Sequence, residues 1–262
     1  SLVGILTGPG QSIGVSVFRQ HLSDGLHLSD SAIATAYLVG TLLSSTLQPR
    51  IGRWVDQVGV RRASTAFGIA FALALAHMSM VRGVVWLAAG FFGIRLLGQG
   101  ALSLTSTVAV MHWFDRRRGF ALGLKMTLTM GGMSIVPILL AVAIDTWGWR
   151  IAWLAASAVI ALTAVPASWF GYVNRPADLG QLPDGEPPVH VGQLGSAPPS
   201  LTRSTALRST AFWALAAVTA TNSLLGTGLL FHQTNLLGEI GYSNAQAAAM
   251  FLPQAIGAVM GG

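Results

Sequence analysis

Hydrophobic residues fall into long runs separated by short polar clusters along most of this 262-residue chain. A hydrocarbon core about 30 Å thick is crossed by about 20 mostly apolar helical residues. Eight runs approach that length, at residues 2–18, 31–49, 63–81, 84–112, 119–144, 150–172, 211–231 and 245–262. Some are apolar around the whole helix, which is atypical of a soluble bundle. Because backbone groups in lipid must be satisfied internally, the pattern predicts an all-α, polytopic helical membrane protein.

One long polar stretch, residues 173–210, follows the sixth run and contains six prolines with glycine, serine and aspartate between them. It has no apolar period, so we expect a flexible linker. The chain then divides into a six-helix half (1–172), a linker (173–210) and two helices of a second half (211–262). Six spans followed by a linker are typical of transporters built from two repeats. We therefore expect a piece of a larger molecule, about eight of twelve spans.

Composition and charge agree with a chain that faces lipid. Hydrophobic residues make up 52% and charged residues only 9%, against about 25% charged in an average soluble domain. The net charge of +6 alone would also suit a nucleic-acid-binding protein, but the cations sit in clusters between apolar runs. If the first span runs outward, the outer loops carry Arg19, Arg82 and Arg150. The inner loops and their edges carry Arg50, Arg53, Arg61, Arg62, Arg116, Arg117, Arg118, Arg175, Arg203 and Arg208.

This asymmetry predicts a cytoplasmic linker, because basic residues concentrate in cytoplasmic loops. It also accounts for the net charge without nucleic acid as a partner. We expect the protein to lie in the cell membrane, with the lipid bilayer as its main surroundings.

The loop between the second and third runs carries the most specific motif, Gly-Arg-Trp-Val-Asp-Gln-Val-Gly-Val-Arg-Arg from Gly52 to Arg62. It resembles the signature G-x-x-x-D-x-x-G-x-R/K-R/K of the major facilitator superfamily, which has it in the same loop. The resemblance implies that Asp56 lies near a helix N-terminus of the other half, where the helix dipole favours a carboxylate. Gly52 and Gly59 would allow close helix approach and a tight turn.

In the same resemblance, Arg61 and Arg62 would pair with acidic groups or helix C-termini and hold the cytoplasmic side closed. The alternative is that the loop holds ordinary positive-inside residues. The presence of Asp56 and of both glycines favours the gating interpretation.

Further stretches resemble the monocarboxylate and oxalate/formate-type branch of that superfamily. The segment from His112 to Gly123 is similar to W-F-x-x-R-R-G-x-A-x-G, and its charged and glycine residues are Asp115, Arg116, Arg117, Arg118 and Gly119. Residues 174–185 resemble the R-P-x-D-x-G…P-D-G run of the bacterial branch. The fourth run contains an R-x-x-x-x-G pattern from Arg95 to Gly100, which resembles a pattern of the superfamily as a whole in this helix. The branch implies small carboxylates as substrates.

Two cations lie inside predicted spans, Arg95 and Lys125, and no Asp or Glu lies well within any span. A charge at mid-bilayer costs about 2.5–3.5 kcal/mol on insertion scales, so such residues usually face a cavity or a partner. Two cations without an acidic partner predict a positive interior that attracts an anion. Two alternatives stay open. Lys125 can extend toward the cytoplasmic face, and Arg95 can make a structural or coupling hydrogen bond.

Polar residues within or beside spans are further candidates for binding substrate or protons: Gln11, Tyr37, Asn222, His232 and Gln254. A histidine can exchange protons near neutral pH, while each of the others also suits a helix–helix hydrogen bond. The four-residue spacing of four glycine pairs predicts close helix contact: Gly4 and Gly8, Gly10 and Gly14, Gly119 and Gly123, and Gly257 and Gly261. Gly131, Gly132 and Pro137 predict a fifth helix that bends.

No catalytic set is visible in the sequence. Nucleophile–base pairs, H-E-x-x-H and the phosphate-binding G-x-x-x-x-G-K-S/T are missing, and a chain with no cysteine excludes thiol chemistry and cysteine metal sites. We predict no enzyme, no cofactor and no metal. The expected function is that of a monomeric secondary transporter for a small organic anion such as a monocarboxylate, working by alternating access with proton symport or anion exchange.

Two alternatives remain at this point. One is an exporter of the same fold for a drug-like or sugar-like molecule; for an apolar or cationic compound it should have acidic residues along its cavity. The more remote one is a membrane receptor that does not transport.

Overall fold

The computed structural model describes residues 2–185, 205, 207–253 and 257, and every regular element in these ranges is helical. The first half contains α1 (Leu2–Leu6), η1 (Gly8–Gly10), α2 (Ser12–Ser16), α3 (Arg19–Leu26), α4 (Asp30–Val58), α5 (Val60–Ser79), α6 (Val84–Ile94), η2 (Arg95–Leu102), α7 (Ser103–Trp113), α8 (Arg118–Met133), α9 (Val136–Trp147) and α10 (Trp149–Gly171). The later chain contains η3 (Pro176–Leu179), η4 (Pro183–Gly185), α12 (Thr210–Glu239) and α13 (Asn244–Ala249).

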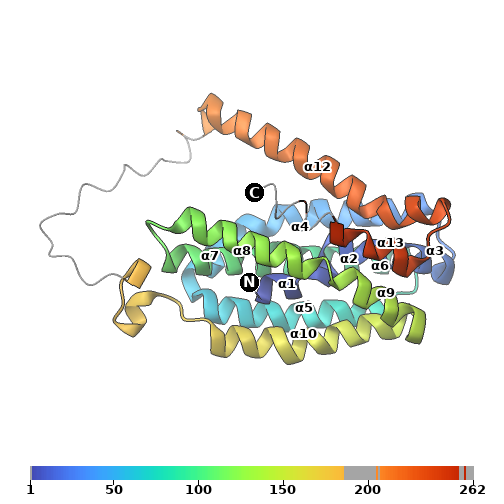
Figure 1. The fold of residues 1–262 in the computed structure, drawn as a ribbon, viewed down its shortest axis with the longest axis horizontal. Coiled ribbons are helices and arrows are strands. Elements are labelled where there is room, and N and C mark those ends of the chain that lie inside the picture. Colours follow the sequence, from blue (N-terminus) through green and yellow to red (C-terminus); the bar gives the residue numbers. More distant parts are fainter. Residues whose placement is uncertain (1, 186–204, 206, 254–256, 258–262) are drawn as a thin grey trace, which may run out of the picture.

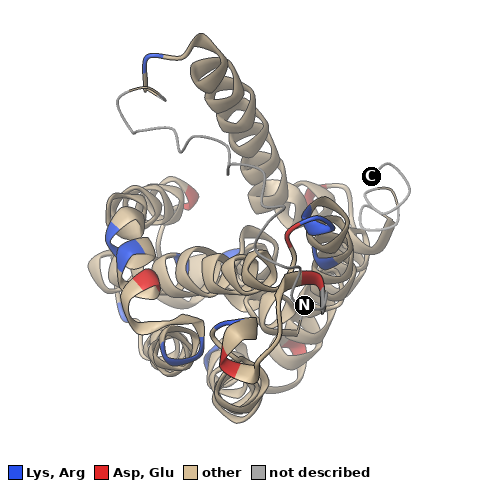
Figure 2. Cartoon of the chain, turned by 90° about the vertical axis from the view of Figure 1, so that its left-hand side faces the viewer, with Lys and Arg blue, Asp and Glu red and all other residues tan. Residues whose placement is uncertain are grey.

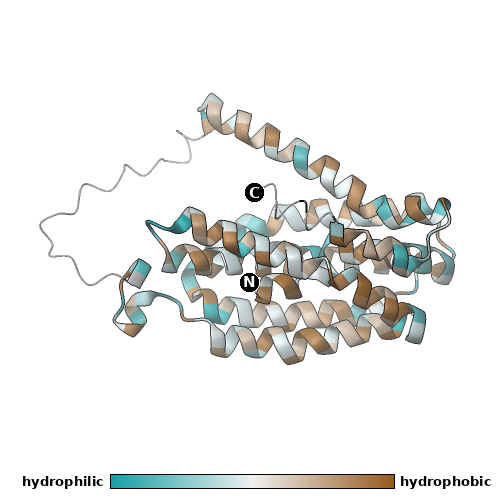
Figure 3. Ribbon diagram, viewed as in Figure 1, coloured by the Kyte–Doolittle hydropathy of each residue, from teal (hydrophilic) through white to brown (hydrophobic). Residues whose placement is uncertain are grey.

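The helices run back and forth along one long axis, so their turns gather at two ends (Figure 1). One end, here called the α3 end, holds α3 and the α5–α6 and α9–α10 turns. The other, the linker end, holds the α4–α5 and α7–α8 turns with η3 and η4. Hydrophobic residues cover the helices between the ends, and hydrophilic residues concentrate at the ends (Figure 3).

The two predicted groups of arginines lie at opposite ends. Arg19, Arg82 and Arg150 lie in α3, in the α5–α6 turn and at the start of α10, all at the α3 end. The described cations of the larger group lie in or near the turns of the linker end, except for Arg208, which precedes α12. Figure 2 views the molecule from that end, with the charged segments in colour. Which end faces the cytoplasm stays a prediction.

Four stretches are long and apolar enough to cross a membrane: Val84–Trp113, Arg118–Trp147, Trp149–Gly171 and Thr210–Glu239. The pair α3 and α4, bent by 116°, passes the same test when taken together as a fifth. The sequence predicted eight spans in total. Of the other three, α5 coincides with the run at 63–81 without meeting the test, and part of the run at 245–262, including Gln254, lies outside the described residues.

The first predicted span, residues 2–18, is wrong as a continuous helix. The Gly8-Pro9-Gly10 segment forms a 3-10 turn that separates α1 from α2. The close packing predicted from the glycine spacing is wrong at Gly119, Gly123 and Gly257, where nothing in the described part of the chain lies within 4 Å of a Cβ. It is confirmed for Gly4 and Gly8, which lie against the fifth span. A Cβ on Gly4 would lie 2.9 Å from the Thr129 hydroxyl, and one on Gly8 would lie 2.8 Å from Val136. That fifth span is itself divided into α8 and α9, as its glycines and proline predicted.

The core of the first half is built on α5 and α10, which pack along much of their lengths (Figure 1). Small polar side chains join them, because Ser64 and Ser168 share a hydrogen bond of 2.9 Å and Ser157 donates to the Ala72 carbonyl at 2.7 Å. Such bonds between small residues hold helices together where no hydrophobic driving force exists. Beside them, the fully buried Trp153 stacks on Phe18 with ring centroids 3.9 Å apart.

The fourth span contains a π-helical segment, η2, between α6 and α7. Segments of this kind are rare and often occur at functional sites. Neighbouring helices approach it closely at its glycines. A Cβ on Gly98 would lie 2.6 Å from the Phe71 ring, and one on Gly100 would overlap Gln48. The widened turn therefore lies between α4 and α5, and its first residue is Arg95.

Helix α12 contacts the first half only near its C-terminal end. Its buried residues are Phe231 and Thr234, whereas its N-terminal part is exposed and diverges from the other helices (Figure 1). Thr234 donates a hydrogen bond of 2.9 Å to the Ser16 carbonyl of α2. The contact between the two predicted halves thus lies at the α3 end.

Candidate functional site

Arg95 is the most deeply placed cation of the predicted site, with 5% of its surface exposed. Its Nη1 donates to the Ser12 hydroxyl at 3.4 Å, and its Cζ lies 5.1 Å from the centre of the Tyr37 ring. Its Nε is buried without a hydrogen-bond partner. Within the described part of the chain no carboxylate pairs with Arg95. A buried charge left without a counter-charge is costly, so this guanidinium is suited to bind an anion.

Tyr37 connects Arg95 to the second half of the molecule. Its hydroxyl shares a hydrogen bond of 2.8 Å with Ser12, which Arg95 also contacts. The Tyr37 ring also packs against α12, because its centroid lies 4.4 Å from that of Phe231. The structure therefore brings two predicted site residues, Arg95 and Tyr37, together at the boundary between the halves.

A second buried cation, Arg19, was not singled out by the sequence as a site residue. It is 4% exposed and pairs through Nη2 with the Asp30 carboxylate at 3.1 Å. Its Nη1 lies 3.1 Å from Nδ1 of His232 on α12. The sequence placed Arg19 among outer loop cations, because it directly follows an apolar run. Only the turn between α2 and α4 brings it under α12.

The remaining candidates have separate surroundings. Lys125 donates from Nζ to the Thr107 hydroxyl at 2.9 Å, between α8 and α7. Gln11 donates to the Thr7 hydroxyl at 3.1 Å inside the broken first span. Asn222 is exposed on α12. The predicted pair of cations therefore has no shared partner in the described structure, and Arg95 is the one that lies beside Tyr37.

The tight turn expected at the gating motif is confirmed at Gly59. This residue has φ of +85° and separates α4 from α5. A side chain there would also collide with Asn174, whose Oδ1 lies 2.6 Å from the position of a Cβ. The Asn174 side chain accepts from the Arg61 amide at 3.0 Å, and its carbonyl accepts from Nδ1 of His112 at 3.0 Å. Asn174 thus joins the ends of α5 and α7 with the chain that follows α10.

The close approach expected at Gly52 is wrong, whereas the gating role of the charged residues of the motif stays a prediction. A Cβ on Gly52 would make only ordinary contact, 3.9 Å from Leu104, so the close approach expected there is absent. Arg61 lies against the last turns of α10, where its Cζ is 4.6 Å from the centre of the Trp169 ring. Its contact there is with an aromatic ring and not with the helix C-terminus. Arg62 and Asp56 are exposed, and no ion pair joins the motif to an acidic or basic group among the described residues.

The first part of the predicted flexible linker is ordered, since η3 and η4 fold against the linker end. Arg175 donates its amide to Asp178 at 3.1 Å, and Gly180, with φ of +67°, ends η3. Further on, Asp184 Oδ2 accepts from the amides of Asp115 at 3.1 Å and Arg116 at 2.8 Å. The sequence missed this order because proline and glycine here form specific turns, while their composition is also typical of flexible chains.

Asp184 therefore caps the loop that leads into α8. The Arg116 amide holds the pKa of this carboxyl below its ordinary value, and the amides of Asp115 and Arg117 and the charge of Arg117 act in the same direction against partial desolvation. A carboxylate at a helix N-terminus is also favoured by the helix dipole. Within the loop itself, Arg118 pairs with Asp115 at 3.1 Å, and Gly119 has open space around it.

We expect the Asp184 contact to fail under acid. Its pKa is lowered by folding, so its contribution is present above the ordinary aspartate pKa and is lost as the pH falls through the lowered value. Asp184→Ala should remove the contact at neutral pH and speed amide hydrogen exchange at Asp115 and Arg116 several-fold. Asp184 has φ of +62°. Asp184→Asn keeps an acceptor and a residue type that tolerates this backbone conformation, so its exchange rates should lie between those of the wild type and the alanine variant. Unchanged exchange in the alanine variant would contradict this assignment.

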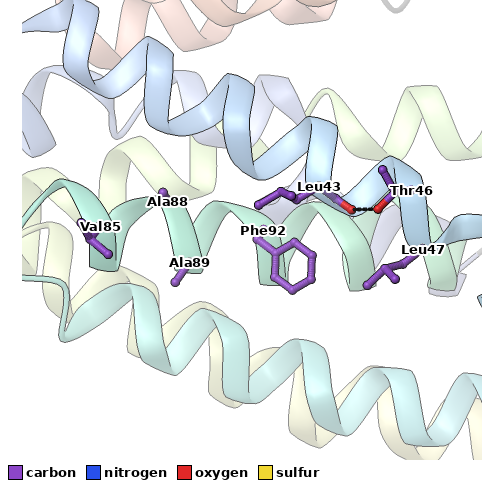
Figure 4. Close-up of a pocket in the computed structure, with 7 residues that line it drawn as sticks. All are labelled: Leu43, Thr46, Leu47, Val85, Ala88, Ala89 and Phe92. Carbon is purple, nitrogen blue, oxygen red and sulfur yellow. Dashed lines mark hydrogen bonds between the residues drawn. The ribbon is translucent and has the colours of Figure 1, made fainter.

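Two apolar grooves lie away from Arg95. One, of about 520 Å³, lies between α4 and α6 and is lined by Leu43, Thr46, Leu47, Val85, Ala88, Ala89 and Phe92. Its single hydroxyl is satisfied within its own helix, because Thr46 donates to the Leu43 carbonyl at 2.8 Å (Figure 4). The other, of about 530 Å³, lies between α9 and α10 and is lined by aliphatic and aromatic residues, glycine and proline. Neither offers a charged group to an anion.

The family model described as Major Facilitator Superfamily matches residues 1–262. The chain belongs to the major facilitator superfamily. Its helices are accordingly those of a multi-pass membrane protein in a transporter family, and the resemblance read from the Gly52–Arg62 motif is confirmed at the level of the superfamily.

One curated relative is monocarboxylate transporter 14 of Homo sapiens, which is 26% identical over 175 residues. The aligned region covers 67% of this chain and 34% of the relative, so the chain spans about a third of that protein's length. This distant match supports membership of the transporter superfamily. The narrower bacterial oxalate/formate-type resemblance rests on the motifs alone.

Proposed function

We propose that this chain is part of a secondary transporter that carries a small organic anion, such as a monocarboxylate, through the cell membrane by alternating access. The transport mode is proton symport or anion exchange. The observation that carries the proposal is the buried Arg95, which has no acidic partner among the described residues and an unused Nε. Intramembrane ionisable residues of this kind usually mark a substrate or ion path. The monocarboxylate transporter relative supports the same substrate class.

The location of Arg95 also suits alternating access. Its neighbour Tyr37 contacts Phe231 of α12, so a movement of one half against the other changes the surroundings of the guanidinium. In this proposal the linker end is cytoplasmic, as its excess of arginines indicates. An exporter of cationic compounds would instead need acidic residues beside this position.

The proposal is tested by uptake measurements on the complete protein in liposomes, with a panel of small carboxylates, sugars and organic cations. We expect carboxylates to be taken up. An inward proton gradient should accelerate uptake if the mode is symport. Uptake by exchange should instead require an anion inside the liposomes. Uptake restricted to sugars or organic cations would refute the proposal.

For the gating motif we expect a loss of transport without a loss of folding. Asp56 is exposed at the end of α4, so Asp56→Asn should leave the thermal midpoint and membrane insertion unchanged but strongly reduce uptake by the complete protein. The exposed Asp24→Asn on α3 is a matched control that should transport normally. Normal uptake by Asp56→Asn would assign the motif to ordinary loop residues.

A further inference from the structure

The contact between the two halves at the α3 end includes one imidazole in a defined protonation state. Arg19 Nη1 and His232 Nδ1 are 3.1 Å apart. A guanidinium can only donate a hydrogen bond, so Nδ1 must supply the lone pair. The His232 ring in this arrangement is therefore neutral, with its proton on Nε2. Arg19 is held for this bond from the other side by Asp30, 3.1 Å from its Nη2.

We propose that His232 is the group through which protons control the contact between the halves. When neutral, it accepts the hydrogen bond from Arg19 and holds the C-terminal end of α12 against α3. When protonated, it loses its only acceptor and places a second positive charge beside the guanidinium, so α12 separates from α3. This inference rests on the proposed transport function and names the coupling group for it.

The neighbours of His232 offer the added proton little compensation. The elements against which α12 packs include α2 and α13, and neither carries a charged side chain. The titratable groups around this end of α12 are Arg19, His21 and Asp24 of α3, Asp30 and Tyr37 of α4, and Glu239 and Tyr242 of the α12 region. Of these, the described contacts of His232 reach Arg19 alone, and the Asp30 carboxylate is already paired with that arginine.

The same contact leads to the predicted anion site. Phe231 precedes His232, and their rings lie 5.2 Å apart. The Phe231 ring lies 4.4 Å from Tyr37, whose ring lies 5.1 Å from Arg95 Cζ. The Arg19 Cζ also lies 5.8 Å from the centre of the Phe231 ring, so release of His232 from Arg19 would weaken the contact of Phe231 with Tyr37, the aromatic neighbour of Arg95. One continuous set of side chains thus connects the proton site with the anion site.

The proposal is tested by measuring the separation of α12 and α4 as a function of pH. Leu38 of α4 and Leu236 of α12 are exposed, and the 262 residues contain no cysteine. In the complete protein, with any cysteine elsewhere replaced, Leu38→Cys and Leu236→Cys can carry spin labels for pulsed distance measurements in nanodiscs. At about pH 8 we expect a single short distance between the labels. Toward about pH 5 a second, longer distance should gain population, because histidine changes charge in this range. If one proton controls the contact, the ratio of the long-distance to the short-distance population should change about tenfold per pH unit below the midpoint.

Two variants separate protonation from other effects. His232→Gln keeps an acceptor but cannot titrate, so it should show the short distance at every pH. His232→Lys carries a fixed charge and should show the long one. His27→Asn, in the exposed α3–α4 turn, should keep the wild-type response. A wild-type distance that ignores pH, or a pH response that persists in His232→Gln, would overturn the proposal. Because the distance is read without substrate, a protein that takes up no carboxylate can still pass or fail this test.

Discussion

Arg95→Gln should nearly abolish carboxylate uptake by the complete protein while leaving its fold intact. The guanidinium is buried, its Nε has no partner, and its described contacts are a long hydrogen bond to Ser12 and the face of Tyr37. A hydrogen bond to a charged group contributes about 1.5–3 kcal/mol, so kcat/KM should fall by about 10- to 150-fold. Uptake of a labelled carboxylate into liposomes measures this effect.

Controls separate anion binding from a structural role. Arg95→Lys keeps the charge without the planar fork and should lie between wild type and Arg95→Gln. Arg208→Gln removes an exposed cation before α12 and should transport normally. Replacing a buried charge that lacks a counter-ion by a neutral residue should preserve or raise the thermal midpoint. If Arg95→Gln lowered that midpoint and uptake together, the arginine would be structural.

Gly40→Val should destabilise the protein and reduce transport through packing alone. A Cβ at Gly40 on α4 would lie 2.7 Å from the Phe92 amide nitrogen and 3.0 Å from the Phe91 carbonyl carbon, both backbone atoms of α6. The helices must therefore move apart, and overpacking of this kind costs about 1–3 kcal/mol. Gly40 lies one turn after Tyr37, which packs edge-on against Phe91 with centroids 5.2 Å apart. The displaced α4 would carry Tyr37 away from Arg95.

A matched substitution isolates this steric effect. Gly123→Val, in α8, places the same side chain where nothing lies within 4 Å of a Cβ. Both changes alter intrinsic helix propensity equally, so their difference in thermal midpoint reports the contact between α4 and α6. We expect Gly40→Val to melt several degrees lower than Gly123→Val in detergent. Equal midpoints would contradict the close approach of α4 and α6 at Gly40.

The helices and their two ends follow largely from sequence, because lipid imposes helical backbone and arginines concentrate at one set of turns. Arg95 was recognisable by the same reasoning, since an arginine inside an apolar run is conspicuous. Asp56, Lys125 and Asn222 were equally conspicuous, and their proposed roles remain predictions. The break at Gly8-Pro9-Gly10 was harder to foresee, because glycine is common in membrane helices and does not by itself end one.

What the sequence could not supply were contacts between distant segments. Asn174 bonds to Arg61 and Asp184 to Arg116 across stretches of chain that no local pattern connects. The sequence pattern placed Arg19 in an outer loop, because its burial depends on α12, a segment distant in the sequence. Its bond to His232 spans 213 positions in the sequence. Periodicity and composition describe neighbours along a helix and carry no information about such pairs.

Because α12 contacts the first half over a short stretch, a small tilt at that contact produces a large displacement of its N-terminal end. From Thr210 to Phe231 the helix extends about 32 Å at about 1.5 Å per residue, while its attachment lies near Phe231 and Thr234. If the helix stays rigid, a tilt of about 10° about that attachment would displace the N-terminal end of α12 by about 5–6 Å. Small movements where the two halves meet at the α3 end would thereby become larger movements of α12 at its opposite end.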